Sequence, residues 1–246
     1  TKKIHKAMEE LRYQPNAVAR ALQQKKSNII GLVLPFIDYA FFSSLTDAVE
    51  EYCHAHGYKL MLCKSGEHQE REQEMFSILQ ANKVDGILVC SRFGDASFLK
   101  DYEFPVVSIE REIEGIPSVM ADDYYGGCLA ANELIAAGSK NPVILGSQVP
   151  DYLPGTKRIE GFCNECSKHG ITANFCMIEN TSMGKKVLEN TFYEYMEKNP
   201  EIDGVFCMGD MIAAQIFTCE RAYVTNIYHK IPIVGFDGFE ISEWMQ

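Results

Sequence analysis

The sequence predicts an α/β protein built from two lobes, each a doubly wound parallel sheet. From Asn28 onward, short continuously apolar segments alternate with amphipathic segments of helical period. The expected helices end at glycines such as Gly57 and Gly170, and the alternation restarts after Gly138. Strands that are apolar on both faces belong in parallel sheets covered by helices, and right-handed crossovers make each sheet doubly wound.

The first half of the chain supplies the first sheet. We expect strands at residues 29–34, 58–63, 87–90, 106–109 and 119–121, and helices at 42–56, 67–82 and 124–138. In the helix at 67–82, Met75, Ile78 and Leu79 lie on one face and are expected to point into the core.

The second half repeats the pattern. We expect strands at residues 143–145, 175–178, 205–208 and 231–235, and helices at 156–169, 184–198 and 210–223. The expected lobes are therefore residues 28–137 and 138–246, preceded by a helical segment at 1–27. Ligands of such sheets bind beyond the carboxyl ends of the strands, so a cleft between the lobes is the expected binding site.

Composition narrows the class of protein. No apolar run is long enough to span a membrane, which predicts a protein without a membrane segment. The nine cysteines are irregularly spaced, as is typical of reduced thiols in the cytoplasm. Cys163 and Cys166 form a lone C-x-x-C within a helical pattern, so neither a metal site nor a redox site is expected there.

Charge is distributed unevenly. Residues 1–26 contain seven lysines and arginines against two glutamates, whereas the whole chain has a net charge of −11. A basic segment attached to an acidic body is attracted to DNA phosphates, while the body is repelled by them. The alternative is that residues 1–26 form an ordinary solvated basic helix.

A motif in this basic segment indicates a family. After an amphipathic helix at 3–11 comes Tyr13-Gln-Pro-Asn-Ala-Val-Ala-Arg-Ala-Leu22. It resembles Y-x-P-N-x-x-A-R-x-L of the lactose-repressor (LacI/GalR) family, where this motif links a helix-turn-helix headpiece to a periplasmic-binding-protein-like core. The resemblance implies that residues 1–27 are the end of a headpiece and a hinge helix. Asn16, Ala19, Arg20 and Leu22 would then contact operator DNA.

Further motifs extend the resemblance along the chain. They are Leu32-Val-Leu-Pro35, Lys83-Val-Asp-Gly-Ile-Leu88, Pro105-Val-Val-Ser-Ile-Glu-Arg111, Asp122-Asp-Tyr-Tyr-Gly-Gly127, Arg158-Ile-Glu-Gly-Phe162, Gly209-Asp-Met-Ile-Ala213 and Val234-Gly-Phe-Asp237. The chain departs from the family pattern at Glu110, Asp123 and Gly209, where the family usually has Asp, Asn and Asn. Relative to that pattern we expect the first headpiece helices and the C-terminal return segments to be missing. Within the family, the chain most resembles repressors of the sucrose or ribose type.

The expected effector site combines donors, acceptors and an aromatic face, because a sugar presents hydroxyl groups and an apolar C–H face. The resemblance implies the following effector-binding residues: Arg158, Asp237 and Asp210 from the second lobe, Phe41 or Phe42 and Ser91 from the first lobe, and Arg111 or Asp123 at the lobe junction.

Each candidate has a purely structural alternative. Arg158 and Asp237 can simply pair with each other, and Asp210 can merely cap the helix that follows it. Phe41 or Phe42 can be a core residue, and Arg111 can be held by its glutamate neighbours.

The function that the resemblance implies is repression of a bacterial carbohydrate operon. We expect a cytoplasmic homodimer that associates with the nucleoid by binding operator DNA and responds to a sugar or sugar phosphate, with no cofactor, metal or catalytic residue. The alternative is a periplasmic sugar-binding protein of a transport system, which would have no use for the basic segment at 1–26. No Walker A, G-x-S-x-G, H-E-x-x-H or dinucleotide-binding motif occurs, so an enzyme is not expected.

Overall fold

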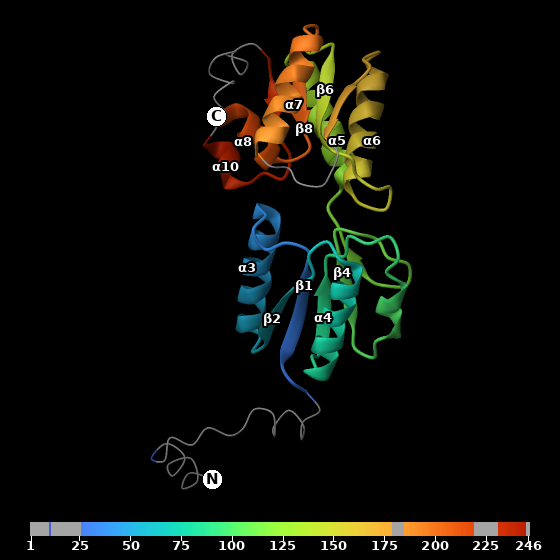
Figure 1. The fold of residues 1–246 in the computed structure, drawn as a ribbon, viewed down its shortest axis with the longest axis vertical. Helices are drawn as coiled ribbons and strands as arrows, with labels where there is room; N and C mark the ends of the chain where they lie inside the picture. Colours follow the sequence, from blue (N-terminus) through green and yellow to red (C-terminus); the bar gives the residue numbers. More distant parts are fainter. Residues whose placement is uncertain (1–9, 11–25, 179–184, 219–230, 245–246) are drawn as a thin grey trace. The chain divides into compact units, whose positions relative to one another are not determined.

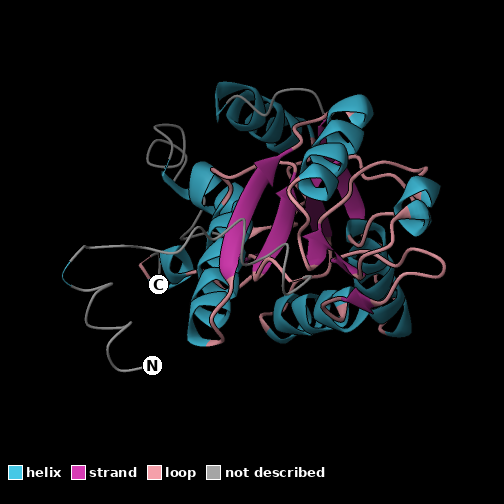
Figure 2. Ribbon diagram, turned by 90° about the horizontal axis from the view of Figure 1, so that it is seen from below, coloured by secondary structure: helices cyan, strands magenta, loops and turns pink. Residues whose placement is uncertain are grey.

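The computed structural model describes residues 10, 26–178, 185–218 and 231–244. The expected hinge residues Asn16, Ala19, Arg20 and Leu22 lie outside these ranges. The chain divides into two compact units, residues 1–119 and residues 120–246. Each is an α/β unit with strands inside and helices outside (Figures 1 and 2), as the sequence predicts.

The first unit contains one parallel sheet with the strand order β2-β1-β3-β4-β5. This is a doubly wound order, in which the chain reverses its direction of winding beside β1. The described elements are β1 (Ile29–Leu34), α3 (Ala40–Ala55), β2 (Lys59–Lys64), α4 (Gln69–Ala81), β3 (Gly86–Val89), the 3-10 helix η1 (Ser97–Asp101), β4 (Val106–Ile109) and β5 (Ser118–Val119).

Helices α3 and α4 cover opposite faces of this sheet. Val33 packs with Phe76 and Leu79 of α4, whereas its neighbours Leu32 and Leu34 pack with α3. Since adjacent residues of a strand point to opposite faces, β1 is buried on both sides. That explains why its sequence is continuously apolar.

The second unit has the same design with the strand order β7-β6-β8-β9, again all parallel. Its described elements are α5 (Asp123–Ala136), β6 (Pro142–Ser147), α6 (Gly155–Lys168), β7 (Asn174–Ile178), α7 (Lys185–Lys198), β8 (Gly204–Cys207), α8 (Asp210–Thr218), β9 (Ile233–Val234) and α10 (Glu240–Glu243). One apolar core joins its sheet to α5, α6, α7 and α8.

Two predictions from the sequence are wrong. The boundary expected after residue 137 lies between Val119 and Met120, so α5 belongs to the second unit and packs in its core. The end of a helix at Gly138 marks only a turn, whereas the true boundary follows β5, the short strand expected near 119–121, which the sequence does not mark as the last of its sheet. In α4, Ile78 is 39% exposed and Phe76 faces the core instead.

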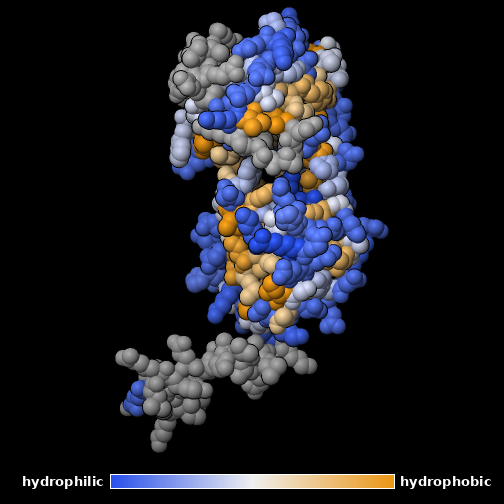
Figure 3. Space-filling view, viewed as in Figure 1, coloured by the Kyte–Doolittle hydropathy of each residue, from blue (hydrophilic) through white to orange (hydrophobic). Residues whose placement is uncertain are grey.

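The surface agrees with this core. Hydrophilic side chains cover most of the face shown in Figure 3, with smaller apolar patches between them. No helix among the described residues combines the length and the apolar composition needed to cross a bilayer.

Candidate functional site

A guanidinium group is fixed at the carboxyl edge of the second sheet. Arg158, in the first turn of α6, contacts Asp123 Oδ1 through Nε at 2.9 Å and Nη2 at 2.7 Å. Its Nη1 donates to the carbonyl of Met208 and lies 4.0 Å from Oδ1 of Asp237. The ring of Phe236 lies 3.3 Å from the guanidinium carbon, a cation–π stacking distance. A charge held this way is pre-organised, since little rotamer freedom remains to be lost on binding.

Two glycines make this ion pair possible by letting α5 and α6 touch. A Cβ added at Gly127 would lie 2.9 Å from the nitrogen of Phe162 and closer still to the carbonyl oxygen of Arg158. A Cβ added at Gly161 would likewise run into the carbonyl group of Tyr124. The close crossing brings the start of α5, with Asp123, against the first turn of α6.

Burial separates the roles of the charged groups. The side chain of Asp123 is 3% exposed, that of Arg158 12% and that of Asp237 15%. Oδ2 of Asp123 is buried without a hydrogen-bond partner among the described residues. Asp123 therefore lies beneath Arg158 and supports it, while Arg158 and Asp237 are the more exposed side chains of the three.

Asp210 holds the loop that carries Asp237. Its carboxylate Oδ2 accepts a hydrogen bond from the backbone of Phe239 at 2.7 Å, and its own N–H donates to the carbonyl of Phe236 at 2.7 Å. Between these contacts Asp237 has φ +101°, an uncommon conformation for a residue other than glycine. Gly235 permits the arrangement because a side chain there would strike the carboxylate of Asp210.

In the first unit, a buried carboxylate organises the corresponding carboxyl edge. The hydroxyl of Ser91, which follows β3, donates to Oε1 of Glu72 at 2.8 Å. Arg111, which follows β4, donates to the carbonyls of Phe93 and of Gly94, the latter at 2.9 Å. Glu72, Ser91 and Arg111 are all buried. Burial raises the pKa of Glu72, and only part of the shift is offset by the Ser91 hydrogen bond and the charge of Arg111.

The two phenylalanines differ in burial. Phe42 is 8% exposed and belongs to the core cluster of Leu32 and Leu34, so the core alternative is correct for this residue. Phe41 is only partly buried, with its ring centroid 5.2 Å from that of Phe42. Of the pair, Phe41 is the one that can offer an aromatic face.

The structure thus groups the expected residues within each unit. One cluster contains Asp123, Arg158, Asp210 and Asp237. The alternative from the sequence was that Arg158 simply pairs with Asp237, but Arg158 contacts Asp123 more closely. The sequence did not reveal Glu72, because a glutamate in the polar stretch 67–74 looks like a surface residue. The sequence also assigned no role to Phe236, although this residue belongs to the motif Val234-Gly-Phe-Asp237. Among the described residues, no group of three or more His, Cys, Asp or Glu side chains is placed to hold a metal.

Comparison with known proteins agrees with these observations. Residues 27–240 match the family described as periplasmic binding proteins and sugar binding domain of LacI family. The chain is 32% identical to the sucrose operon repressor of Lactococcus lactis subsp. lactis, covering 98% of this chain and 74% of that protein. It is also 32% identical to the ribose operon repressor of Bacillus subtilis (strain 168), covering 94% of this chain and 70% of that protein.

A solved structure shows the same architecture. The periplasmic binding protein/LacI transcriptional regulator from Alkaliphilus metalliredigens QYMF, complexed with D-xylulofuranose, superposes with a TM-score of 0.74 at 27% identity. The match covers 89% of this chain and 81% of that one. Together with the family match over residues 27–240, these similarities show that the chain belongs to the LacI family of transcriptional regulators.

Proposed function

We propose that this chain represses transcription and changes its affinity for operator DNA when a sugar or sugar phosphate binds at the carboxyl edges of its sheets. The relatives named above are operon repressors, and the ligand of the similar solved structure is a sugar. The proposed protein is a homodimer in the bacterial cytoplasm, because helix-turn-helix repressors read two half-sites with two subunits.

The observation that carries the proposal is the guanidinium of Arg158 held between Asp123, Phe236 and the carbonyl of Met208, with Asp237 beside it. Arg158 supplies donors and Asp237 supplies acceptors, the complement of a pair of sugar hydroxyls. A sugar phosphate would add a charge for which a guanidinium is well suited. We propose that Arg158 and Asp237 contact the effector and that Asp123 and Asp210 position them.

In the first unit, we propose that Phe41 offers the aromatic face for the C–H side of the sugar. Ser91 and Arg111 are engaged with Glu72 and with backbone carbonyls. Their proposed role is to shape the edge of the site around Phe41.

The DNA-binding part of the proposal rests on residues 1–27, most of which lie outside the described residues. The segment from Asn16 to Leu22 can form at most two helical turns, too few to be stable alone in water. Folding of such a segment on DNA couples operator binding to its point of attachment, and an effector that changes this attachment changes operator affinity. Leu22 is the proposed apolar wedge in the minor groove.

The experiment that tests this function is a thermal-shift screen with D-ribose, sucrose, D-xylulose and their phosphates. A specific ligand adds RT ln(1 + [L]/Kd) to the free energy of unfolding and so raises the melting temperature. Asp237→Asn should lose the shift and stay folded, because asparagine tolerates positive φ. Glu160→Gln, an exposed change on α6, is the matched control and should keep it. An unchanged shift in folded Asp237→Asn would remove Asp237 from the site.

A further inference from the structure

The two units share an aspartate anchor at the opposite, amino edge of each sheet. Val84-Asp85-Gly86 leads into β3 in the first unit, and Ile202-Asp203-Gly204 leads into β8 in the second. Each of these strands lies beside the first strand of its own sheet, with Gly86 paired to Ile30 and Gly204 to Pro142. The two aspartates therefore occupy equivalent positions in the repeated fold.

In the second unit, Asp203 holds the turn that leads into β6. Its carboxylate accepts from the hydroxyl of Ser139 at 2.6 Å, and from the backbone N–H groups of Lys140 at 2.9 Å and of Asn141 at 2.8 Å. Burial opposes ionisation of Asp203, but these hydrogen bonds outweigh it and lower its pKa. The segment held here is internal, because it joins α5 to β6.

In the first unit, Asp85 makes contacts of the same kind, with one serine hydroxyl and two backbone N–H groups of the segment that leads into β1. Oδ1 accepts from the N–H of Ser27 at 2.8 Å and from its hydroxyl at 3.0 Å, while Oδ2 accepts from the N–H of Asn28 at 2.9 Å. The N–H of Asp85 donates to the carbonyl of Ile29 at 2.8 Å. Asn28 has φ +55°, so the chain bends where the carboxylate holds it.

Lys26, two residues before this bend, also has a defined contact. The ammonium of Lys26 lies 4.9 Å from the ring centroid of Tyr58. The carbonyl of Asn28 accepts from the N–H of Lys59 at 2.8 Å. Residues 26–28 thus have a defined course at the point where the basic segment 1–25 joins the first unit.

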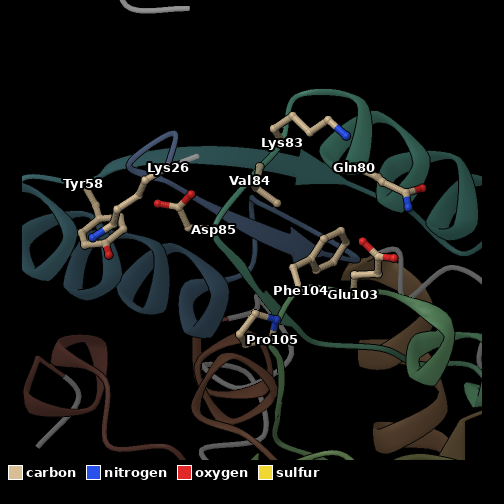
Figure 4. A pocket seen from close by; sticks show the side chains of 9 residues that line it. All are labelled: Lys26, Tyr58, Gln80, Lys83, Val84, Asp85, Glu103, Phe104 and Pro105. Atoms are coloured by element: carbon tan, nitrogen blue, oxygen red, sulfur yellow. The ribbon is translucent and has the colours of Figure 1, made fainter. Parts of the chain in front are cut away.

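A pocket of about 660 Å³ lies next to the anchor. Lys26 and Asp85 are on one side of it, and Gln80, Lys83, Glu103 and Phe104 are on the other (Figure 4). Asp85 is half-buried beside this space, so a side chain of similar size at position 85 meets no crowding. An isosteric change from Asp to Asn therefore alters the hydrogen bonds without altering the packing.

We infer that Asp85 is a positioning residue for DNA binding: its carboxylate holds residues 27 and 28, through which the basic segment 1–25 is joined to the first unit. This inference rests on the proposed repressor function. Asp203 holds its turn with the same chemistry but joins two elements inside the second unit. Both anchors therefore support local structure, and only the anchor at Asp85 also controls how the DNA-binding segment is presented.

The test compares Asp85→Asn with Asp203→Asn in the protein expressed from its complete gene. Asparagine replaces one acceptor oxygen by an N–H donor, which then faces a backbone N–H. The probe is duplex DNA selected from a random library by the wild-type protein, with unselected duplex as the non-specific reference. Melting temperature and oligomeric state are measured for every variant.

We expect Asp85→Asn to weaken binding to the selected duplex by about tenfold or more, as expected for a lost coupling of typical size. Its affinity for unselected duplex should be nearly unchanged, because no basic side chain is removed. Asp203→Asn should lower the melting temperature to a similar extent and keep its affinity for the selected duplex. Equal operator affinities of the two variants would overturn the inference.

A second pair of variants covers the case in which an aspartate variant fails to fold. Ser27→Ala removes one hydrogen bond to Asp85, and Ser139→Ala removes the equivalent bond to Asp203. Only Ser27→Ala should weaken specific binding, by a smaller factor, and equal effects of these two variants would also overturn the inference. If the wild-type protein selects no duplex at all, the proposed function itself is wrong, and the two failures are thereby distinguished.

Discussion

Replacement of Gly127 by alanine tests how the fold positions Arg158. The added Cβ would lie 2.9 Å from the nitrogen of Phe162 and 3.0 Å from the carbonyl carbon of Arg158, whereas ordinary contacts are 3.4 Å or longer. These obstacles, and the carbonyl oxygen of Arg158 that lies closer still, are backbone atoms, so α5 and α6 must separate by more than about half an ångström. The 2.9 Å contact from Nε of Arg158 to Asp123 would lengthen accordingly.

The magnitude follows from two opposing effects. Overpacking costs about 3 kcal/mol when backbone must move, the upper part of the usual range. Alanine in place of glycine inside a helix returns about 1 kcal/mol. The net loss of about 2 kcal/mol corresponds to a fall in melting temperature of about 8 °C for a unit of this size.

Differential scanning calorimetry and sugar titration provide the assay. Gly155→Ala is the matched control, because its added methyl meets only side-chain methyl groups of Met208 and Val149, at 3.2 Å, and no backbone atom. Gly127→Ala should melt earlier and bind sugar more weakly, whereas Gly155→Ala should show neither effect. If the Gly127→Ala protein is as stable as the wild type, the close packing of α5 against α6 does not position Arg158.

Three further outcomes are expected. Asp123→Ala leaves Arg158 without its buried partner, so urea unfolding should show a loss of about 3 kcal/mol that an Asp123→Leu/Arg158→Met double variant largely recovers; equal losses in both would contradict this. Burial raises the pKa of Glu72 above its ordinary 4.5, so its contribution to stability is lost as pH rises from about 4.5 through the folded-state pKa. The free energy of unfolding of Glu72→Gln should then rise relative to that of the wild type between pH 4.5 and 7. A difference that does not change with pH would contradict the raised pKa of Glu72. Burial raises the pKa of both Cys163 and Cys166, that of Cys166 to about 11, but Cys163 is the one described cysteine that is partly exposed. Brief iodoacetamide treatment followed by peptide mass spectrometry should therefore find Cys163 modified before Cys166.

The fold was largely predictable because its signals are local and periodic. Strands such as β1 are apolar on both faces, and helices end at glycines such as Gly138 and Gly170, both of which have positive φ. The boundary between the units was not predicted, because the sequence of α5 does not show which of the two cores its apolar face packs against. The position of the boundary is decided by a tertiary contact, the packing of α5 on the core of the second unit.

The site was predictable only in part. Motif positions pointed to Arg158 and Asp237, but residue types alone could not show that Asp123 lies beneath Arg158. The role of Glu72 was hidden because it depends on burial, and burial depends on how α4 packs against the sheet. Asp85 belongs to the motif Lys83-Val-Asp-Gly-Ile-Leu88, but its role was not predicted, because its contacts with Ser27 and Asn28 join segments far apart in the chain.

The most direct test of the account is the affinity of the complete protein for its selected operator duplex, measured by fluorescence anisotropy with and without the sugar found in the thermal-shift screen. We predict that the sugar changes the operator Kd of the wild type by a factor within about 5–150. Asp237→Asn should bind the duplex with the wild-type affinity in the absence of sugar and should not respond to it. An operator affinity of the wild type that stays the same at saturating sugar would contradict the central claim, as would an undiminished response in folded Asp237→Asn.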